Sequence, residues 1–288
     1  KTDQNGNGIV EIYTDVIETL GSINGDTNLI INNGTVGGSI FGGSDGEVAK
    51  IEGNTLVNIN NGTISGSVYG GGNVAAVTGD SNVIVTNAKL SNVYGGGNQG
   101  LINGSTYVQV LDSAEIETIF AGSNQSNVLN DTNIIITNGT IKNLYGGNNI
   151  TGLINGKLNT TINGGKISNL YGGGNKADTT SNTYVEVNGG SITKLYGGGK
   201  EALVNQSNIT VNNTDQINRI YGGGYAGNIA SDTNIEVNDG LIIYIFGGGY
   251  SGDVTGNTNI EVNAGKITDI YGGGYVGDVL ENANIAVN

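Results

Sequence analysis

The feature that most constrains the fold is a repeat, in which an aromatic residue followed by glycines recurs every 25 to 28 residues. The aromatic residues of this repeat are Phe41, Tyr69, Tyr94, Phe120, Tyr145, Tyr171, Tyr196, Tyr221, Phe246 and Tyr271. A fixed period of this length is typical of a solenoid, in which each repeat packs only against its neighbours. Because the repeat fills nearly the whole sequence, we predict a single domain over residues 1–288.

Each repeat reads as short β-strands separated by turns. In the copy at residues 246–270, Thr258, Ile260 and Val262 alternate with polar residues. A spacing of two residues is the period of a strand and not of a helix. The chain has 53 glycines and no proline, so Gly, Asn and Asp must form the turns. Three short strands per repeat, with no hexapeptide subperiod, predict an all-β, right-handed parallel β-helix of about 25 residues per coil and about 11 coils.

Stacked coils place equivalent residues in columns about 4.8 Å apart. One column is aliphatic and is interrupted by Thr160, which we expect to be a weak point. A second column holds Thr and Ser, whose hydroxyls we expect to bond up the stack. A third holds asparagines such as Asn188, Asn238 and Asn263, and it resembles the internal asparagine ladder of right-handed β-helix proteins such as pectate lyases.

Composition excludes several classes of function. The net charge is −14 and the 11 Lys and Arg residues are scattered, which argues against nucleic acid as a partner. No apolar run approaches the ~20 residues of a spanning helix, so we expect no membrane insertion. There is no cysteine, so disulfides and thiolate metal sites are excluded. The sequence begins and ends mid-coil, which predicts either a fragment of a longer chain or a subunit that self-associates through open solenoid ends.

Two groups of polar residues are candidates for cation binding. Asp3, Asn5 and Asn7 match the front of a calcium loop, but the loop's twelfth position, which needs a bidentate acid, is Thr14. Short acidic columns form a second group that either binds a cation or stays hydrated: Glu186, Glu236 and Glu261, and Asp253 with Asp278. Apart from Ca²⁺ at the first group, we expect no cofactor.

The aromatic residues are the main candidates for a binding surface. The residue before each of them is aliphatic and the one before that is mostly polar, so alternation predicts that the rings point outward. In the last three coils the residue four positions later is also a tyrosine. We therefore expect an aromatic face suited to sugar rings or partner proteins, made of Tyr221, Tyr225, Phe246, Tyr250, Tyr271 and Tyr275. The alternatives are that the rings only stabilise this face, or that the glycine bend turns them inward.

The repeat "IYGGGYxGxVxGxTNIxVNxGxI" resembles the Gly/Asn-rich repeats of adhesin-like β-helix proteins on bacterial surfaces. The resemblance implies an extracellular or cell-surface location and a host or cell-surface glycan or protein as partner. We expect no enzyme, because the chain has no histidine and its only arginine, Arg219, has no acidic cluster that the sequence places beside it. We predict a structural or adhesive segment. The alternatives are a fibre subunit that stacks end to end, or a polysaccharide-binding or polysaccharide-cleaving module.

Overall fold

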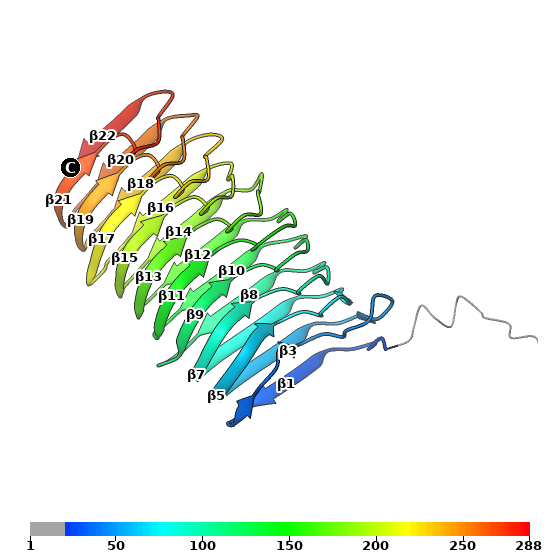
Figure 1. The fold of residues 1–288 in the computed structure, drawn as a ribbon. Helices are drawn as coiled ribbons and strands as arrows, with labels where there is room; N and C mark the ends of the chain where they lie inside the picture. The colour runs from blue at the N-terminus through cyan, green and yellow to red at the C-terminus, as the bar shows by residue number, and fades with distance from the viewer. Residues whose placement is uncertain (1–20) are drawn as a thin grey trace, which may run out of the picture.

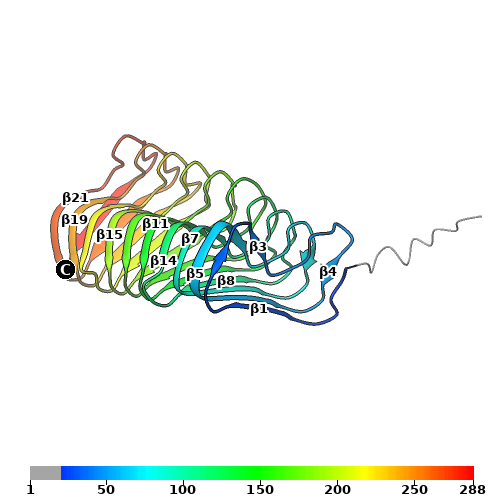
Figure 2. The same ribbon diagram turned by 60° about the horizontal axis from the view of Figure 1, so that its bottom comes forward.

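The chain folds into a parallel β-solenoid of about ten coils, seen side-on in the computed structural model of Figure 1. The structure describes residues 21–288, and this part of the chain contains no helix. The predicted fold class is therefore confirmed, and the coil expected before residue 21 lies outside the described residues. In the turned view of Figure 2, the coils follow one another in sequence order, from β1 and β4 at one end to β21 at the other.

The first face of the solenoid is built from the Thr-x-Ile-x-Val segments, each paired in parallel register with the coils before and after it. For example, Ile235 lies opposite Ile209 and Ile260. Its strands are β1 (Thr27–Ile31), the first part of β5 (Thr55–Tyr69), the first part of β7 (Ser81–Tyr94), β8 (Thr106–Val110), β10 (Thr132–Ile136), β12 (Leu158–Ile162), β14 (Thr183–Val187), β16 (Ser207–Val211), β18 (Thr233–Val237), β20 (Thr258–Val262) and β22 (Ala283–Val287).

The second face is formed by the segments that end at the repeated aromatic residue. β5 and β7 run continuously from the first face to the second, whereas the later coils break between two strands. The other strands of this face are β2 (Thr35–Val36), β3 (Ile40–Phe41), β9 (Glu115–Phe120), β11 (Thr140–Tyr145), β13 (Lys166–Tyr171), β15 (Ser191–Tyr196), β17 (Gln216–Tyr221), β19 (Leu241–Phe246) and β21 (Lys266–Tyr271).

The third side of each coil is less regular than the sequence predicts. In place of a full third strand, it carries the short pair β4 (Lys50–Ile51) and β6 (Ala76–Val77) and then single bridges such as Val204 to Ile229. Most coils contribute one apolar residue here, within a long turn of glycine and polar residues that cannot sustain a two-residue alternation.

The core is a set of aliphatic columns that runs the length of the stack. Residues such as Ile209, Val211, Ile217 and Ile220 lie inside the coil, and their equivalents in neighbouring coils pack above and below them. The smaller columns on the third side form two clusters, one ending at Ile154 and Leu158 and the other beginning at Val204. Between these clusters the equivalent residue is the buried Thr179.

The Thr and Ser column is buried, but its hydroxyls do not bond up the stack as expected. Most of them bond across their own coil, to the carbonyl of the glycine that follows the repeated aromatic residue, whereas the buried Oγ1 atoms of Thr55 and Thr106 have no hydrogen-bond partner. Thr183 Oγ1 donates to Gly197 O at 2.6 Å, and Thr233 Oγ1 donates to Gly247 O at 2.6 Å. The backbone of the glycine bend curls back toward this column, so its carbonyl is the nearest acceptor, and the hydroxyls join the first face to that bend.

Asparagine ladders are present, but the one predicted to be internal lies on the surface. Asn238 Nδ2 donates to Asn212 Oδ1 at 3.0 Å, and Asn263 Nδ2 donates to Asn238 Oδ1 at 2.9 Å, in bonds that are exposed to solvent. A second ladder, which we call the amide ladder, is half-buried behind the glycine bends. Its members are Asn73, Asn98, Asn124, Asn149 and Asn175, joined by bonds of 2.7 to 2.9 Å.

The glycines after each aromatic residue are required by close approach between coils. A Cβ added to Gly223 would lie 2.7 Å from Gly249 N and 2.8 Å from Gly249 Cα. The backbone φ of Gly223 is not in the left-handed region, so the constraint is space and not conformation. No helix in residues 21–288 has the length and apolar character needed to cross a bilayer.

Candidate ligand-binding groove

The repeated aromatic residues form a continuous stack, which we call the ring ladder. Successive rings from Phe41 to Tyr271 lie with their centroids 4.6 to 5.0 Å apart and their planes within 2° to 10° of parallel. The ladder is a cluster separate from the aliphatic core, as the alternation of the strands predicts. However, the eight rings from Tyr69 to Phe246 are only 1% to 8% exposed. The expectation that Tyr221 and Phe246 form an exposed surface is therefore wrong.

The rings are buried because they are covered from a later coil, by the side chain that stands four residues after that coil's own aromatic residue. In the last three coils these side chains are Tyr225, Tyr250 and Tyr275, which we call the cover tyrosines. Each lies edge-on to the ring of the preceding coil, with centroids 5.6 to 5.9 Å apart and planes at 85° to 90°. In earlier coils asparagines take this place, and Asn149 Nδ2 donates to the hydroxyl of Tyr94 at 3.3 Å. Sequence parity cannot reveal this cover, because it comes from a neighbouring coil.

The cover tyrosines are the part of the predicted aromatic face that reaches solvent. They stack on one another at 5.0 and 5.1 Å. Tyr225 is 37% exposed and Tyr275 is 57% exposed, whereas Tyr250 is half-buried. Tyr271 is 48% exposed. The six predicted residues thus lie together on adjacent coils, in two layers instead of one face.

Burial keeps the tyrosines of the ring ladder protonated. Loss of hydration raises the pKa of Tyr94 and of Tyr171 to about 12, and it raises the pKa of Tyr145 and Tyr196 further. Burial also raises the pKa of Tyr221, although the nearby positive charge of Arg219 opposes the shift. These phenols are therefore neutral at physiological pH and suited to packing, not to taking up a proton.

A third row of side chains turns this region into a groove. Arg219, Tyr244 and Asp269 occupy equivalent positions on β17, β19 and β21, two residues before the ring ladder. The Arg219 guanidinium carbon lies over the Tyr244 ring at 5.7 Å from its centroid. A hollow of ≈ 460 Å³, which we call the aromatic groove, is lined by Arg219, Tyr244, Phe246, Tyr271, Gly274 and Tyr275.

The aromatic groove offers a ligand both aromatic surface and a positive charge. Ring faces can pack against the apolar face of a ligand, and the guanidinium can donate to an acidic or polar group. Neither a carboxylate nor a hydroxyl nucleophile with a base beside it is among the residues that line the hollow. The sequence had pointed to Phe246, Tyr271 and Tyr275, but not to Arg219 or Tyr244 as a pair. Tyr244 could have been found, because it lies two residues before Phe246 and shares its strand parity.

The acidic columns serve the backbone or remain in solvent. Asp253 Oδ1 accepts a hydrogen bond from the backbone N–H of Asp278 at 2.9 Å, so this column caps the turns between coils. Glu236 and Glu261 line a separate open hollow of ≈ 440 Å³ on the first face, beside a row of mostly half-buried asparagines. Within residues 21–288, no three acidic side chains gather closely enough to hold a metal ion. The calcium candidates Asp3, Asn5 and Asn7 lie outside the described residues.

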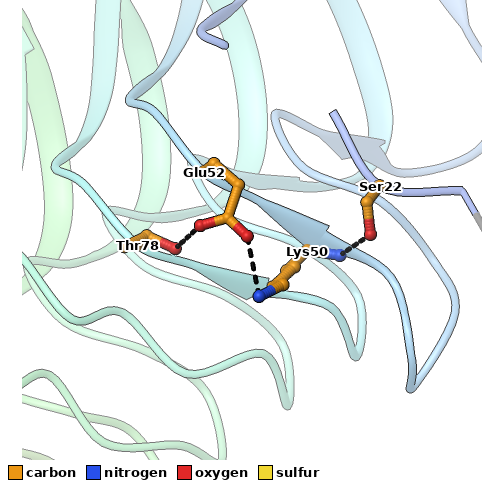
Figure 3. A network of polar contacts seen from close by, with 4 residues as sticks. All are labelled: Ser22, Lys50, Glu52 and Thr78. Carbon is orange, nitrogen blue, oxygen red and sulfur yellow. Dashed lines mark hydrogen bonds and ion pairs between the residues drawn. The ribbon is translucent and has the colours of Figure 1, made fainter. Parts of the chain in front are cut away.

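Titratable side chains also meet on the third side of the early coils (Figure 3). Glu52 lies 2.7 Å from Lys50 Nζ and accepts a hydrogen bond from Thr78 Oγ1 at 3.2 Å. The hydrogen bond from Lys50 holds the pKa of Glu52 below its ordinary value. The Lys50 backbone N–H donates to Ser22 Oγ at 3.1 Å, so the network joins three coils. Its members are solvent-exposed, which fits a surface tie between coils better than a reactive centre.

A shallow polar groove runs along the second face of the early and middle coils. Three adjoining hollows of ≈ 450, ≈ 680 and ≈ 440 Å³ share lining residues such as Lys89, Thr140 and Ser168. Lys89 pairs with Glu115 at 3.1 Å, and Lys142 pairs with Glu117. Because Lys89 and Lys142 are paired and the lining has no aromatic residue, this groove offers less to a ligand than the aromatic groove.

Comparisons with known proteins give no match: no family model, no curated protein and no solved structure matches the chain. The β-solenoid with asparagine ladders rests on the structure itself, and membership of an adhesin-like family stays a prediction.

Proposed function

We propose that the chain is a structural and adhesive β-solenoid segment of a secreted or cell-surface bacterial protein. The observation that supports this proposal is the continuity of its ladders. The ring ladder, the amide ladder and the aliphatic columns each link successive coils, so that bending the stack would disturb all of them together. A rod of this kind can hold a binding surface away from its point of attachment.

Electron microscopy and cell labelling test this proposal. The purified chain should appear as straight, uniform rods. Antibodies against it should label intact cells of the organism that makes it. Flexible or globular particles, or labelling only after the cells are broken, would contradict the structural role or the surface location respectively. The same micrographs test the alternative of a fibre subunit, since rods that remain dispersed at high concentration would count against end-to-end stacking.

The aromatic groove favours a second candidate function, which is saccharide binding. Tyr275, one of the cover tyrosines, lines the hollow together with the rings of Tyr244 and Tyr271 and the guanidinium of Arg219. Such surfaces suit the apolar face and hydroxyls of a pyranose. The lining holds no pair of carboxylates that could cleave a glycosidic bond, so binding is favoured over the polysaccharide-cleaving alternative.

A glycan array tests this second function. We expect the wild-type chain to bind a subset of saccharides, and the Tyr275→Ala variant to lose most of that signal, because the exposed ring is removed. Tyr184→Ala is the matched control, since Tyr184 lies on β14, on the first face and away from the groove. Equal signals from the two variants would contradict saccharide binding at the groove.

A further inference from the structure

Positive charge gathers beside the aromatic groove in a strongly acidic chain. Lys194 and Arg219 lie side by side in register on β15 and β17, two residues before the ring ladder. Across the groove, Lys200 stands in the row of the cover tyrosines, one coil before Tyr225. The whole chain has only 11 Lys and Arg residues against 25 acids, so three cations on two neighbouring coils form a distinct patch.

Two of these cations are free of acidic partners. Lys200 Nζ lies 3.9 Å from a carboxylate oxygen of Glu201. In contrast, no carboxylate in the described part of the chain forms an ion pair with Lys194 or Arg219. Of these two cations, Arg219 is the one that lines the aromatic groove, so its positive charge is available to a ligand there.

The contact with Tyr244 orients Arg219. The guanidinium carbon lies 5.7 Å from the centroid of the ring, a cation–π contact that uses none of its N–H groups in a hydrogen bond. These groups form a planar fork that matches the two oxygens of a carboxylate, or two oxygens of a sulfate. The exposed rings of Tyr271 and Tyr275 lie in the same hollow, so an acidic group on Arg219 would bring the rest of its molecule over aromatic surface.

We propose that the aromatic groove binds an acidic saccharide chain, with its carboxylate or sulfate on Arg219 and Lys194 and its sugar rings on Tyr244 and Tyr275. This inference rests on the saccharide-binding function proposed above and adds the class of ligand. A chain is favoured over a single sugar because the three rows of side chains run along the solenoid axis, so the groove is elongated in that direction. A nucleic acid is disfavoured by the net charge of −14.

Titration calorimetry with three oligosaccharides of equal length tests this inference. The probes are an oligogalacturonate, which carries carboxylates, a sulfated chondroitin oligosaccharide and a neutral cello-oligosaccharide. We expect at least one acidic probe to bind at least about tenfold more tightly than the neutral one, since a charge-assisted hydrogen bond adds roughly a factor of ten or more to affinity. The acidic probe that binds more tightly identifies the acidic group. The preference should weaken as salt is raised.

Variants locate the effect at the groove. Arg219→Gln should lower the affinity for the acidic probe about tenfold or more and lower the affinity for the neutral probe much less. Tyr244→Leu should weaken both, because it removes a ring face. Lys266→Gln is the matched control. It removes the same charge from an exposed residue at the start of β21, and it should change neither affinity. Unchanged denaturation midpoints would show that all three variants fold.

Several outcomes would overturn the inference. If the neutral probe binds as tightly as the acidic ones, the saccharide-binding function is supported but the preference for an acidic ligand is rejected. Equal losses in Arg219→Gln and Lys266→Gln would show that only net charge matters and would also reject the site. If none of the probes binds although the rods are intact, the saccharide function and this inference fall together, and the structural role remains.

Discussion

At the scale of single residues, Thr160 is a polar side chain in an apolar part of the core. This side chain stands in the aliphatic column of the first face, between Ile134 and Val185, and is 1% exposed. Its hydroxyl is buried and has no hydrogen-bond partner. The sequence predicts this weak point, because a hydroxyl replaces a methyl group in a column that is otherwise aliphatic.

Replacing Thr160 with valine should raise the free energy of unfolding by about 1 to 2 kcal/mol, since it removes an unsatisfied buried polar group without changing the shape. Denaturant unfolding followed by circular dichroism measures the effect. Thr233→Val is the matched control and should be destabilising, because it breaks the bond from Thr233 Oγ1 to Gly247 O. A lower midpoint for Thr160→Val would contradict the prediction.

Two glycines at the same place in the repeat should respond differently to alanine. A Cβ on Gly223 would meet the backbone of Gly249, whereas one on Gly273 would have nothing within 4 Å. We expect Gly223→Ala to cost about 1 to 3 kcal/mol of stability and Gly273→Ala to be nearly neutral. The difference between their thermal midpoints is the measurement. Similar losses at both sites would mean that conformational freedom, and not space, selects glycine in these bends.

At the scale of elements, the burial of the ring ladder makes the stability of the fold depend on pH. The pKa of Tyr94 and of Tyr171 is about 12 in the folded chain, against 10.0 for an ordinary tyrosine. Above about pH 10 the unfolded chain therefore releases these protons while the folded chain retains them. The stabilisation is complete below about pH 10 and is lost as the pH rises toward about 12.

We accordingly expect the denaturation midpoint to be insensitive to these groups near neutral pH and to fall steeply in that alkaline range. The Tyr171→Phe variant should show a shallower fall, because it removes one such proton. Phenylalanine is tolerated at equivalent places, as Phe120 and Phe246 show. Identical slopes for the variant and the wild type would mean that the ladder does not control alkaline unfolding.

The amide ladder can be tested in the same way. Asn124 Nδ2 donates to Asn98 Oδ1, and Asn124 Oδ1 accepts from Asn149 Nδ2. Asn124→Ala removes both bonds and should cost about 1 to 3 kcal/mol of stability, measured by denaturant unfolding. Ser168→Ala, at an exposed position on β13, is the control and should cost little. A loss of stability no larger than that of the control would show that the ladder contributes little to the stability of the fold.

At the scale of the whole molecule, the coil is the unit of assembly. Deleting residues 172–196 would join Tyr171 to Gly197 and remove one complete coil. We expect the shortened chain to fold, because each coil contacts only its neighbours. The deletion also removes Thr179, so the two apolar clusters of the third side would meet at Ile154 and Val204. Circular dichroism and denaturation test this, and a half-coil deletion of residues 172–183, which breaks the register, should abolish folding.

The sequence predicts the parts of this molecule that depend on position along one coil. The period, the paired strands and the aliphatic columns all follow from alternation and repetition, as the register of Ile235 with Ile260 shows. What could not be predicted depends on contacts between coils or across one. The burial of Tyr221 comes from Tyr250 of the next coil, and the acceptor of Thr233 lies on the far side of its own coil. The pairing of Arg219 with Tyr244 is of the same kind.

The amide ladder also has a net dipole along the axis of the rod. Every amide in it points its N–H group toward the earlier coil and its oxygen toward the later one, so the side-chain dipoles add instead of cancelling. As at the two ends of a helix, charges of opposite sign should be favoured at the two ends of such a row. The chain supplies them: the carboxylate of Asp45 accepts from Asn73 at 2.6 Å, and Lys200 follows Asn175 at the other end. These two charges lie within the rod, at the ends of the ladder, and therefore offset its dipole there.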